Sequence, residues 1–153
     1  APDVMVAFGR PKGRRGAYRQ WEEGGIAPQV VFEVLSPSNS QMEMADKLRF
    51  YDQYGVEEYY LYDPKQHHLE IYQRPRSRLK RVLHLNGWIS PRLGIRLVLT
   101  PVTLEIYHPN GQPFLSSVEL ARLKTAAEAR AERLAERLRA LGIDPNDVSG
   151  TRD

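Results

Sequence analysis

One short stretch of the chain constrains the fold more than any other. Residues 29–35 (QVVFEVL) form an almost continuous apolar run rich in branched side chains, and residues 3–8 (DVMVAF) form a second run of the same kind. Such runs predict strands that are covered on both faces, as in the centre of an α/β sheet. The sequence therefore predicts an α/β (α+β) domain in which both runs are central strands.

Each of these two runs carries an acidic residue. Glu33 is the one ionisable residue within 29–35, and Asp3 opens the other run. A buried carboxylate costs several kcal/mol unless it is paired or ligates a metal. We therefore expect a compensating group near Glu33.

A helix is predicted directly after the second run. Ser40 and Glu43 have the S-x-x-E form of a capping box, which predicts a helix over about 41–54, and Gly55 provides its end.

Lys47 is the candidate partner for the carboxylates. At about 100° per residue, Lys47 falls inside the apolar stripe of this helix, which comprises Met44, Leu48, Tyr51 and Tyr54. An inward-facing lysine is well placed to reach Glu33. A plain buried ion pair, with Asp3 capping a strand, remains an alternative to a catalytic site.

The remaining pattern predicts further strands and a second helix. Strands are expected at 58–63, 68–73, 79–85 and 94–99, followed by a hairpin over 104–114 about Asn110-Gly111. The last helix should cover 117–141. Its apolar seam comprises Leu120, Leu123, Ala127, Ala131, Leu134, Leu138 and Leu141. This seam could pack on its own domain or form a coiled coil with a second chain.

The domain boundaries follow from these elements. We expect a core over 1–115, the C-terminal helix over 116–141 and a loose tail over 142–153, with further residues upstream of Ala1. At 153 residues and 41% hydrophobic content the chain suits one core. It has no cysteine, so any metal must be held by oxygen or imidazole ligands. It has no long apolar run, so we expect no membrane contact and a cytoplasmic protein.

Positive charge gathers in two segments although the net charge is only +3. Residues 9–28 form a long loop rich in Gly, Arg and Pro, and residues 74–81 (RPRSRLKR) carry five basic residues and no acid. Such clusters attract a polyanion. The alternative is a solvated loop beside an edge strand that is protected by charge.

The residues discussed above resemble a known superfamily. Pro2-Asp3 before a strand, Glu33 in the next strand and a nearby lysine resemble the PD-(D/E)XK nucleases. More narrowly, VVFEVLSPS and DKLRFYDQYGVEEYYLYDP resemble a restriction endonuclease family of unknown specificity, over roughly residues 2–100. The resemblance implies a restriction-endonuclease-like mixed central sheet with a flanking helix, beside the long C-terminal helix, and a further helix and strands upstream.

The sequence departs from the superfamily pattern at one position. Leu35 stands where the E-x-K motif has its lysine, and in the narrower family the lysine lies in the following helix, which matches Lys47. The resemblance implies that Asp3, Glu33 and the carbonyl of Val34 bind Mg²⁺ or Mn²⁺ and that Lys47 is catalytic. The implied activity is endonucleolytic hydrolysis of phosphodiester bonds in DNA, with RNA as an alternative.

The basic segments are the candidate nucleic-acid contacts. Arg14, Arg15, Arg19, Arg76, Arg78 and Lys80 would hold the backbone, and Tyr18 and Trp21 could stack on bases. A second hypothesis from another functional class is a nuclease-derived, non-catalytic module that binds nucleic acid or assembles. Such a module would form a homodimer through residues 117–141.

Overall fold

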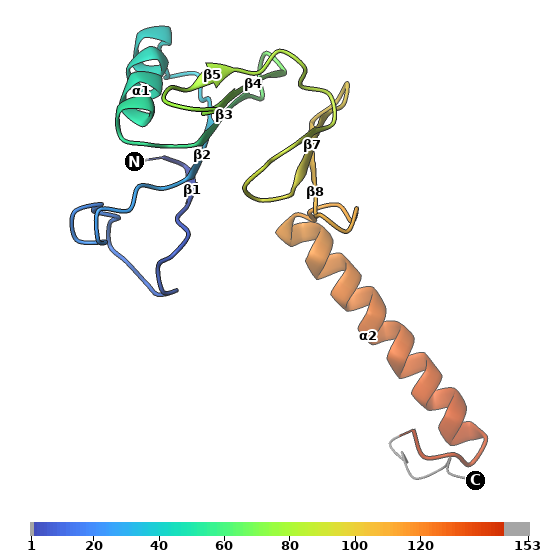
Figure 1. Cartoon of the computed structure of the whole chain (residues 1–153). Helices are drawn as coiled ribbons and strands as arrows, with labels where there is room; N and C mark the ends of the chain where they lie inside the picture. Colours follow the sequence, from blue (N-terminus) through green and yellow to red (C-terminus); the bar gives the residue numbers. More distant parts are fainter. Residues whose placement is uncertain (1, 146–153) are drawn as a thin grey trace. The chain divides into compact units, whose positions relative to one another are not determined.

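The computed structural model describes residues 2–145 of the chain (Figure 1). The chain divides into two compact units, Ala1–Pro113 and Phe114–Asp153, and each is described by itself. Most of the tail expected over 142–153 lies outside the described residues. The mixture of helices and strands confirms the predicted α/β (α+β) class.

The first unit is built on a five-stranded mixed sheet in the order β1-β2-β3-β4-β5. β2 and β3 run parallel, and the other neighbouring pairs are antiparallel. The strands are β1 (Val4–Val6), β2 (Val30–Val34), β3 (Glu58–Asp63), β4 (His68–Gln73) and β5 (Lys80–Arg81).

Helix α1 (Gln41–Gln53) forms the crossover between the two parallel strands. The hydroxyl of Ser40 accepts a hydrogen bond from the backbone N–H of Glu43 at 3.1 Å, as half of a capping box requires. The carboxylate of Glu43 does not complete the box, because it instead accepts hydrogen bonds from the amide of Asn39. The predicted helix is therefore confirmed with a simpler cap.

The α1 side of the sheet holds one hydrophobic cluster. Its buried members are Val31, Tyr51, Val56 and Tyr59, and Leu48 packs against them. The predicted inner stripe of α1 is confirmed at Leu48 and Tyr51 but wrong at Tyr54. Tyr54 is 46% exposed and packs on Phe50, because the helix ends there at its C-cap.

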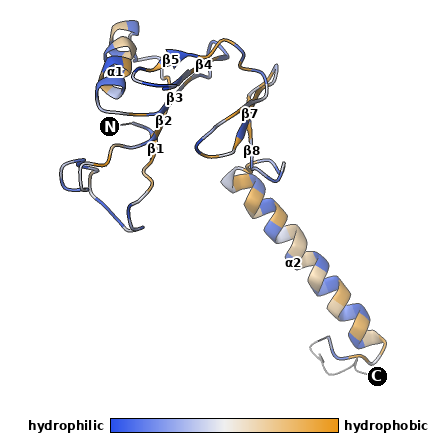
Figure 2. Cartoon of the chain, viewed as in Figure 1, coloured by the Kyte–Doolittle hydropathy of each residue, from blue (hydrophilic) through white to orange (hydrophobic). Residues whose placement is uncertain are grey.

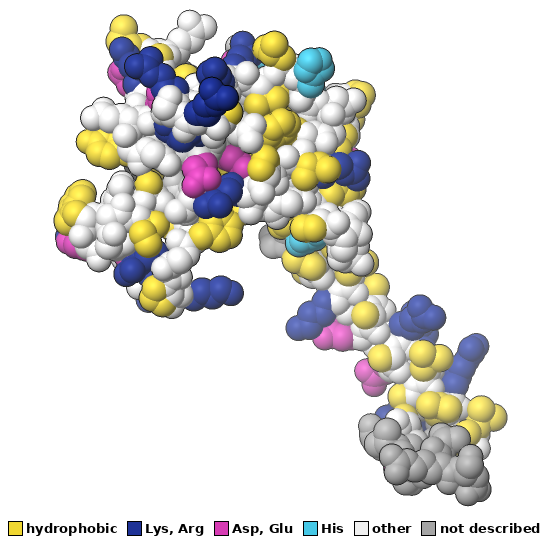
Figure 3. Space-filling model, in the orientation of Figure 1, with side chains coloured by type: hydrophobic (Ala, Val, Ile, Leu, Met, Phe, Trp, Pro, Cys, Tyr) yellow, Lys and Arg dark blue, Asp and Glu magenta, His cyan; other side chains and the backbone are white. Residues whose placement is uncertain are grey.

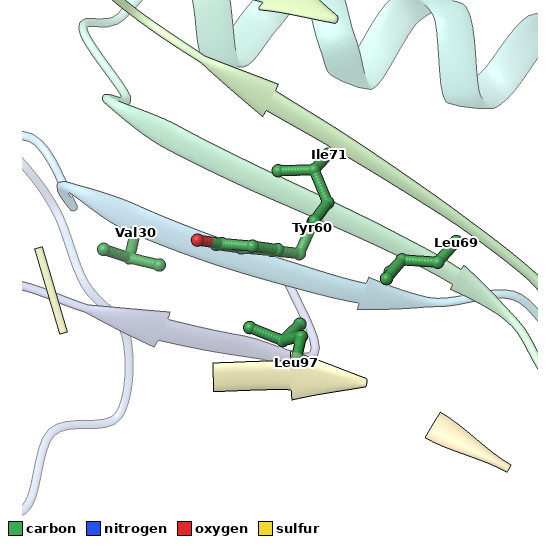
Figure 4. Packing of buried hydrophobic residues seen from close by; sticks show 5 residues of the cluster. All are labelled: Val30, Tyr60, Leu69, Ile71 and Leu97. Carbon is green, nitrogen blue, oxygen red and sulfur yellow. The ribbon is translucent and has the colours of Figure 1, made fainter. Parts of the chain in front are cut away.

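A second, antiparallel sheet covers the opposite face, in the order β6-β7-β8. Its strands are β6 (Trp88–Ile89), β7 (Arg96–Leu99) and β8 (Leu104–Tyr107). Leu97 of β7 is fully buried against a cluster on the first sheet that comprises Val30, Tyr60, Leu69 and Ile71 (Figure 4). The unit thus has three layers, with β2 and β3 in the middle layer.

Some sequence predictions for this unit were wrong in detail. The run 3–8 yields only the three residues of β1, which is the last strand at one side of the described sheet and leaves Val4 54% exposed. It is therefore not a central strand among residues 2–145. The strand expected over 79–85 has only two residues, and β6 was not predicted. The hairpin about Asn110-Gly111 is confirmed, with His108 and Gln112 bonded across the turn at 2.7 Å.

Helix α2 (Ser117–Ala140) is the main element of the second unit. Ser116 and Glu119 form a complete capping box at its start, and Gly142, at a φ of 75°, follows its end. Hydrophobic and hydrophilic residues alternate along it (Figure 2). None of the residues of α2 is buried. Within residues 2–145 no helix has the length and apolar character needed to span a bilayer.

Candidate active site

Glu33 lies on the face of β2 that α1 covers. Along this strand Val31 and Glu33 point to the helix side while Val30 points to the opposite cluster, as the alternation of a strand requires. The side chain of Glu33 is only 4% exposed. The expectation that its carboxylate is buried is confirmed.

Lys47 provides the compensating charge. Its Nζ atom lies 3.0 Å from Oε2 of Glu33, and its side chain is 26% exposed, so the ammonium reaches the carboxylate from the solvent side. Partial burial acts to lower the pKa of Lys47. The hydrogen bond and the charge of Glu33, aided by Glu43 and Asp3, outweigh burial and leave this pKa above its ordinary value. Lys47 is therefore a charged donor at neutral pH.

Tyr51 is a contributor that the sequence reasoning missed. Its hydroxyl donates a 2.5 Å hydrogen bond to Oε1 of Glu33. Burial, with the hydrogen bond and charge of Glu33, raises the pKa of Tyr51 far above its ordinary value, so the hydroxyl keeps its proton. The available signal was its position one turn after Lys47 on the same face, where a tyrosine was counted only as an apolar residue.

Asp3 lies at the end of the neighbouring strand. Val4 pairs with Phe32, so one further step of the antiparallel register sets Asp3 opposite Glu33. The exposed carboxylate accepts a 2.7 Å hydrogen bond at Oδ2 from the backbone N–H of Val34. It also acts on the pKa of both Lys47 and Tyr51 through its charge. Asp3 thus caps the pairing of β1 with β2 and adds negative charge beside the Glu33–Lys47 pair.

Besides Glu33 of β2, a carboxylate of α1 itself also faces Lys47. Glu43 lies 3.6 Å from the ammonium, one helical turn away, and its side chain is 44% exposed. Hydrogen bonds from Asn39, with the charge of Lys47, hold the pKa of Glu43 below its ordinary value. The ammonium therefore has one buried and one exposed carboxylate as neighbours.

Residues 1–112 match the family Uma2, which is described as "Putative restriction endonuclease". The chain belongs to the Uma2 family. The matched range includes Asp3, Glu33, Lys47 and all the strands described above. The expected relationship to restriction-endonuclease-like proteins is thereby confirmed.

A crystal structure from Anabaena variabilis, titled as "a putative nuclease belonging to DUF820", shares 22% identity with this Uma2 chain at a TM-score of 0.33. That match covers 42% of this chain and 35% of the other, so it spans about a third of the length of that protein. No curated protein matches the chain.

In the loop 9–28, the arginines that were predicted to bind nucleic acid differ from one another in their contacts. Arg15 lies 2.6 Å from Glu23, and Arg19 lies 3.0 Å from Glu22. Tyr18 donates its hydroxyl to the carbonyl of Ile26, so this ring helps to fold the loop. Arg14 is exposed, and Trp21 is 78% exposed. Arg14, Trp21 and Arg19, whose side chain is 56% exposed, remain open to a ligand, whereas the side chain of Arg15 is 29% exposed.

The basic residues of the segment 74–81 fall into two groups, those with an ion-pair partner and those without one among the described residues. Arg74 is tied to the backbone of Val56 and to Asp52, and Arg81 lies 3.3 Å from Glu70. The predicted contacts Arg76, Arg78 and Lys80 are exposed and have no ion-pair partner among the described residues. These three supply an exposed positive patch, which we call the 76–80 patch.

Proposed function

We propose that this Uma2 chain is a divalent-metal-dependent endonuclease that hydrolyses phosphodiester bonds in DNA, with Asp3, Glu33 and Lys47 as its catalytic residues. The observation that carries this proposal is the buried carboxylate of Glu33, held 3.0 Å from the ammonium of Lys47. The family match to restriction endonucleases supports the same chemistry.

The donor atoms near Glu33 suit a hard cation. Asp3 and Glu33 offer carboxylate oxygens, and the carbonyl of Val34 is a neighbouring backbone oxygen. Residues 2–145 contain no cluster of three or more Asp, Glu, His or Cys side chains that could hold a metal. Two carboxylates fit Mg²⁺ or Mn²⁺, because such ions keep several waters and use one or two protein carboxylates together with substrate phosphate. The bound ion would supply charge neutralisation at the phosphate and a more acidic water.

Lys47 and Tyr51 have separate roles in this proposal. The ammonium of Lys47 is charged and partly exposed, so it can donate to a phosphate oxygen or orient the attacking water. The protonated hydroxyl of Tyr51 holds the other oxygen of Glu33 and fixes the direction of the carboxylate. Tyr51 is therefore a positioning residue.

DNA binding is assigned to the exposed cations. Arg76, Arg78 and Lys80 can contact backbone phosphates, and Arg14 with Trp21 can do so from the loop 9–28. Arg15 takes part only if DNA displaces Glu23, whereas the exposed side chain of Arg19 can contact phosphate beside Glu22. We therefore expect binding that weakens as salt rises and that depends mainly on the 76–80 patch.

The test is nicking of supercoiled plasmid with Mg²⁺ or Mn²⁺. Wild type should convert plasmid to open circles, whereas Asp3→Asn, Glu33→Gln and Lys47→Ala should lose at least about a hundredfold in rate, a loss typical of removing a catalytic group. Asp46→Asn and Arg49→Ala are matched controls, because these two side chains are exposed and pair with each other outside the site. Equal nicking by wild type and the three site variants, with all proteins folded by circular dichroism, would refute the proposal.

A specific observation favours a second, non-catalytic function. The predicted seam of α2 is solvent-exposed, with Leu120 at 55%, Leu123 at 57% and Leu134 at 51%. Lysine and arginine side chains lie along this helix beside the hydrophobic ones (Figure 3). An isolated helix gains little stability without packing of its apolar face.

We infer that a second copy of the chain covers this seam as a parallel coiled coil. If Leu120 occupies an a position, Glu119 and Lys124 occupy the flanking g and e positions, where opposite charges pair between chains. Sedimentation of the full chain should give a dimer. The pair Leu134→Glu and Leu138→Glu should shift it to monomer, whereas Ala129→Glu on the opposite face should not. An unchanged mass of the double variant would refute this assembly.

A further inference from the structure

A cleft of about 410 Å³ lies between α1 and the β3–β4 hairpin. Its helix wall includes Met44 and Leu48, and its sheet wall includes Leu61 and Tyr72. It lies on the same sheet face as the candidate active site, because Glu33 pairs with Leu61 and Leu61 pairs with Glu70. Neighbouring strands are about 4.8 Å apart, so the cleft begins one strand away from Glu33.

One residue of the cleft wall, Tyr59, carries a buried hydroxyl that has no partner in the described part of the chain. Tyr59 is 1% exposed, lines the cleft, and its Oη atom has no hydrogen-bond partner among the described residues. Leaving a buried polar group unpaired costs about 1–3 kcal/mol. Burial, followed by the charge of Glu33, raises the pKa of Tyr59 far above its ordinary value, so the hydroxyl is protonated. A ligand with an acceptor atom would satisfy this group.

The charges around the cleft select against an anion. Asp63 and Glu70 are carboxylates in its wall, beside His68, and the described residues that line it include no Lys or Arg. Arg81 lies 3.3 Å from Glu70 and offsets one of these charges. Carboxylate oxygens accept hydrogen bonds from amino groups, as they do from the amino group of cytosine. A phosphate is therefore disfavoured. Tyr72, His68 and Arg81 already contact the oxygens of Glu70. The N–H groups of Lys65 and Gln66 bond Oδ1 of Asp63, so Oδ2 of Asp63 is the acceptor offered to an amino-bearing group.

The size and the apolar walls of the cleft suit a flat ring. Met44 and Leu48 face Leu61 and Tyr72 across it, and the volume lies in the range of sites for small ligands. Proteins that bind unstacked bases, in single strands or after base flipping, hold these bases against apolar and aromatic side chains. A nucleobase with an exocyclic amino group combines this shape with the required hydrogen bonds.

We propose that this cleft binds one unpaired, amino-bearing nucleobase of the substrate, cytosine or adenine, while the adjoining phosphodiester lies at Glu33 and Lys47. The location of the phosphodiester rests on the proposed nuclease function. Binding of the base itself rests only on the cleft. A target strand must therefore present an unstacked base beside the bond that is cut.

The first test uses nucleosides, which have no phosphate and need no metal. Titration of ¹⁵N-labelled full chain with cytidine or adenosine should give saturable amide shifts within residues 59–72, and uridine should bind more weakly. Tyr59→Phe should weaken cytidine or adenosine binding about fivefold, the equivalent of one hydrogen bond. Because this change removes an unpaired buried hydroxyl, the variant should unfold at the same or a higher urea concentration than wild type.

A second variant and a control complete the test. Ala45→Trp places a bulky ring in the helix wall and should abolish binding, whereas Tyr107→Phe in the second sheet should not change it. Equal cytidine binding by wild type, Tyr59→Phe and Ala45→Trp would overturn the proposal, as would equal affinity for uridine or no saturable shift. Glu33→Gln should keep nucleoside binding while it loses plasmid nicking. The proposal of base binding in the cleft and the proposal of nuclease activity can therefore be refuted independently.

Discussion

Tyr51 and Glu33, 18 residues apart in the sequence, are joined by a 2.5 Å hydrogen bond in the buried layer between α1 and the sheet. Lys47, one helical turn earlier, donates to the other oxygen of the same carboxylate. Both donors therefore come from one face of one helix. The docking of α1 on β2 and β3 fixes the direction of the only buried carboxylate on the helix side of the described sheet.

The first prediction concerns Tyr51. Tyr51→Phe leaves one oxygen of the buried Glu33 without its donor, so the free energy of unfolding should fall by about 1–3 kcal/mol. Urea denaturation followed by circular dichroism measures this loss. Tyr54→Phe is the matched control on the same helix, because Tyr54 is 46% exposed. Equal stability of the two variants would contradict the role given to Tyr51.

The second prediction concerns the packing of the two sheets. Leu97→Ala removes a fully buried side chain from the cluster around Tyr60 and should cost about 2–5 kcal/mol of unfolding free energy. Leu83→Ala changes a residue that is 83% exposed and should stay within about 0.5 kcal/mol of wild type. Thermal denaturation compares them. A loss of the same size in both variants would mean that Leu97 does not join the sheets.

The third prediction concerns a buried acidic residue outside the active site. Glu58 is 1% exposed, and its carboxylate accepts hydrogen bonds from the hydroxyls of Ser90 and Tyr60 and from the backbone N–H of Arg92. Ser90→Ala should therefore cost about 1–3 kcal/mol. Ser117→Ala, an exposed serine of α2, is its control. Urea midpoints that match for the two variants would show that the turn after β6 does not depend on Glu58.

The fourth prediction concerns pH. Hydrogen bonds from Arg15 and then Arg10, opposed by burial, hold the pKa of Glu23 below its ordinary value of 4.5. The folded-state pKa is lowered, so these contacts stabilise the loop fully above pH 4.5 and are lost as pH falls through the folded value. Trp21 fluorescence should report this acid transition. Glu23→Gln should remove it while Glu22→Gln keeps it, and identical titrations of wild type and Glu23→Gln would contradict the assignment.

The sequence predicted those parts of the fold whose signal is local. β3 and β4 begin and end where their alternating residues and the Asp63-Pro64 turn predict. β5 and β6 have two residues each and depend on pairing with neighbours, so no run of residues marks them. Pairing between distant strands, such as β2 with β3, has no signal in either strand alone.

The site was predictable where a charge stands in an apolar context. Glu33 and Lys47 were recognised because each is a charged residue in an apolar pattern, and in the structure the two side chains form a hydrogen bond. Tyr51 was missed because a tyrosine fits an apolar stripe without needing its hydroxyl to be considered. Glu58 was missed because it follows another glutamate at the start of a strand, where charge is ordinary. The ion pairs of Arg15 and Arg19 depend on how the loop 9–28 folds. The irregular sequence of this loop has no periodic pattern from which those pairs could be predicted.

The most direct measurement of the central claim is an anomalous difference map from crystals of the full chain soaked in Mn²⁺. The account predicts a peak between the carboxylates of Asp3 and Glu33 in wild type and its loss in Glu33→Gln. A fully ordered wild-type site with no peak there at saturating Mn²⁺ would contradict it, and Glu33 with Lys47 would then be only a buried ion pair.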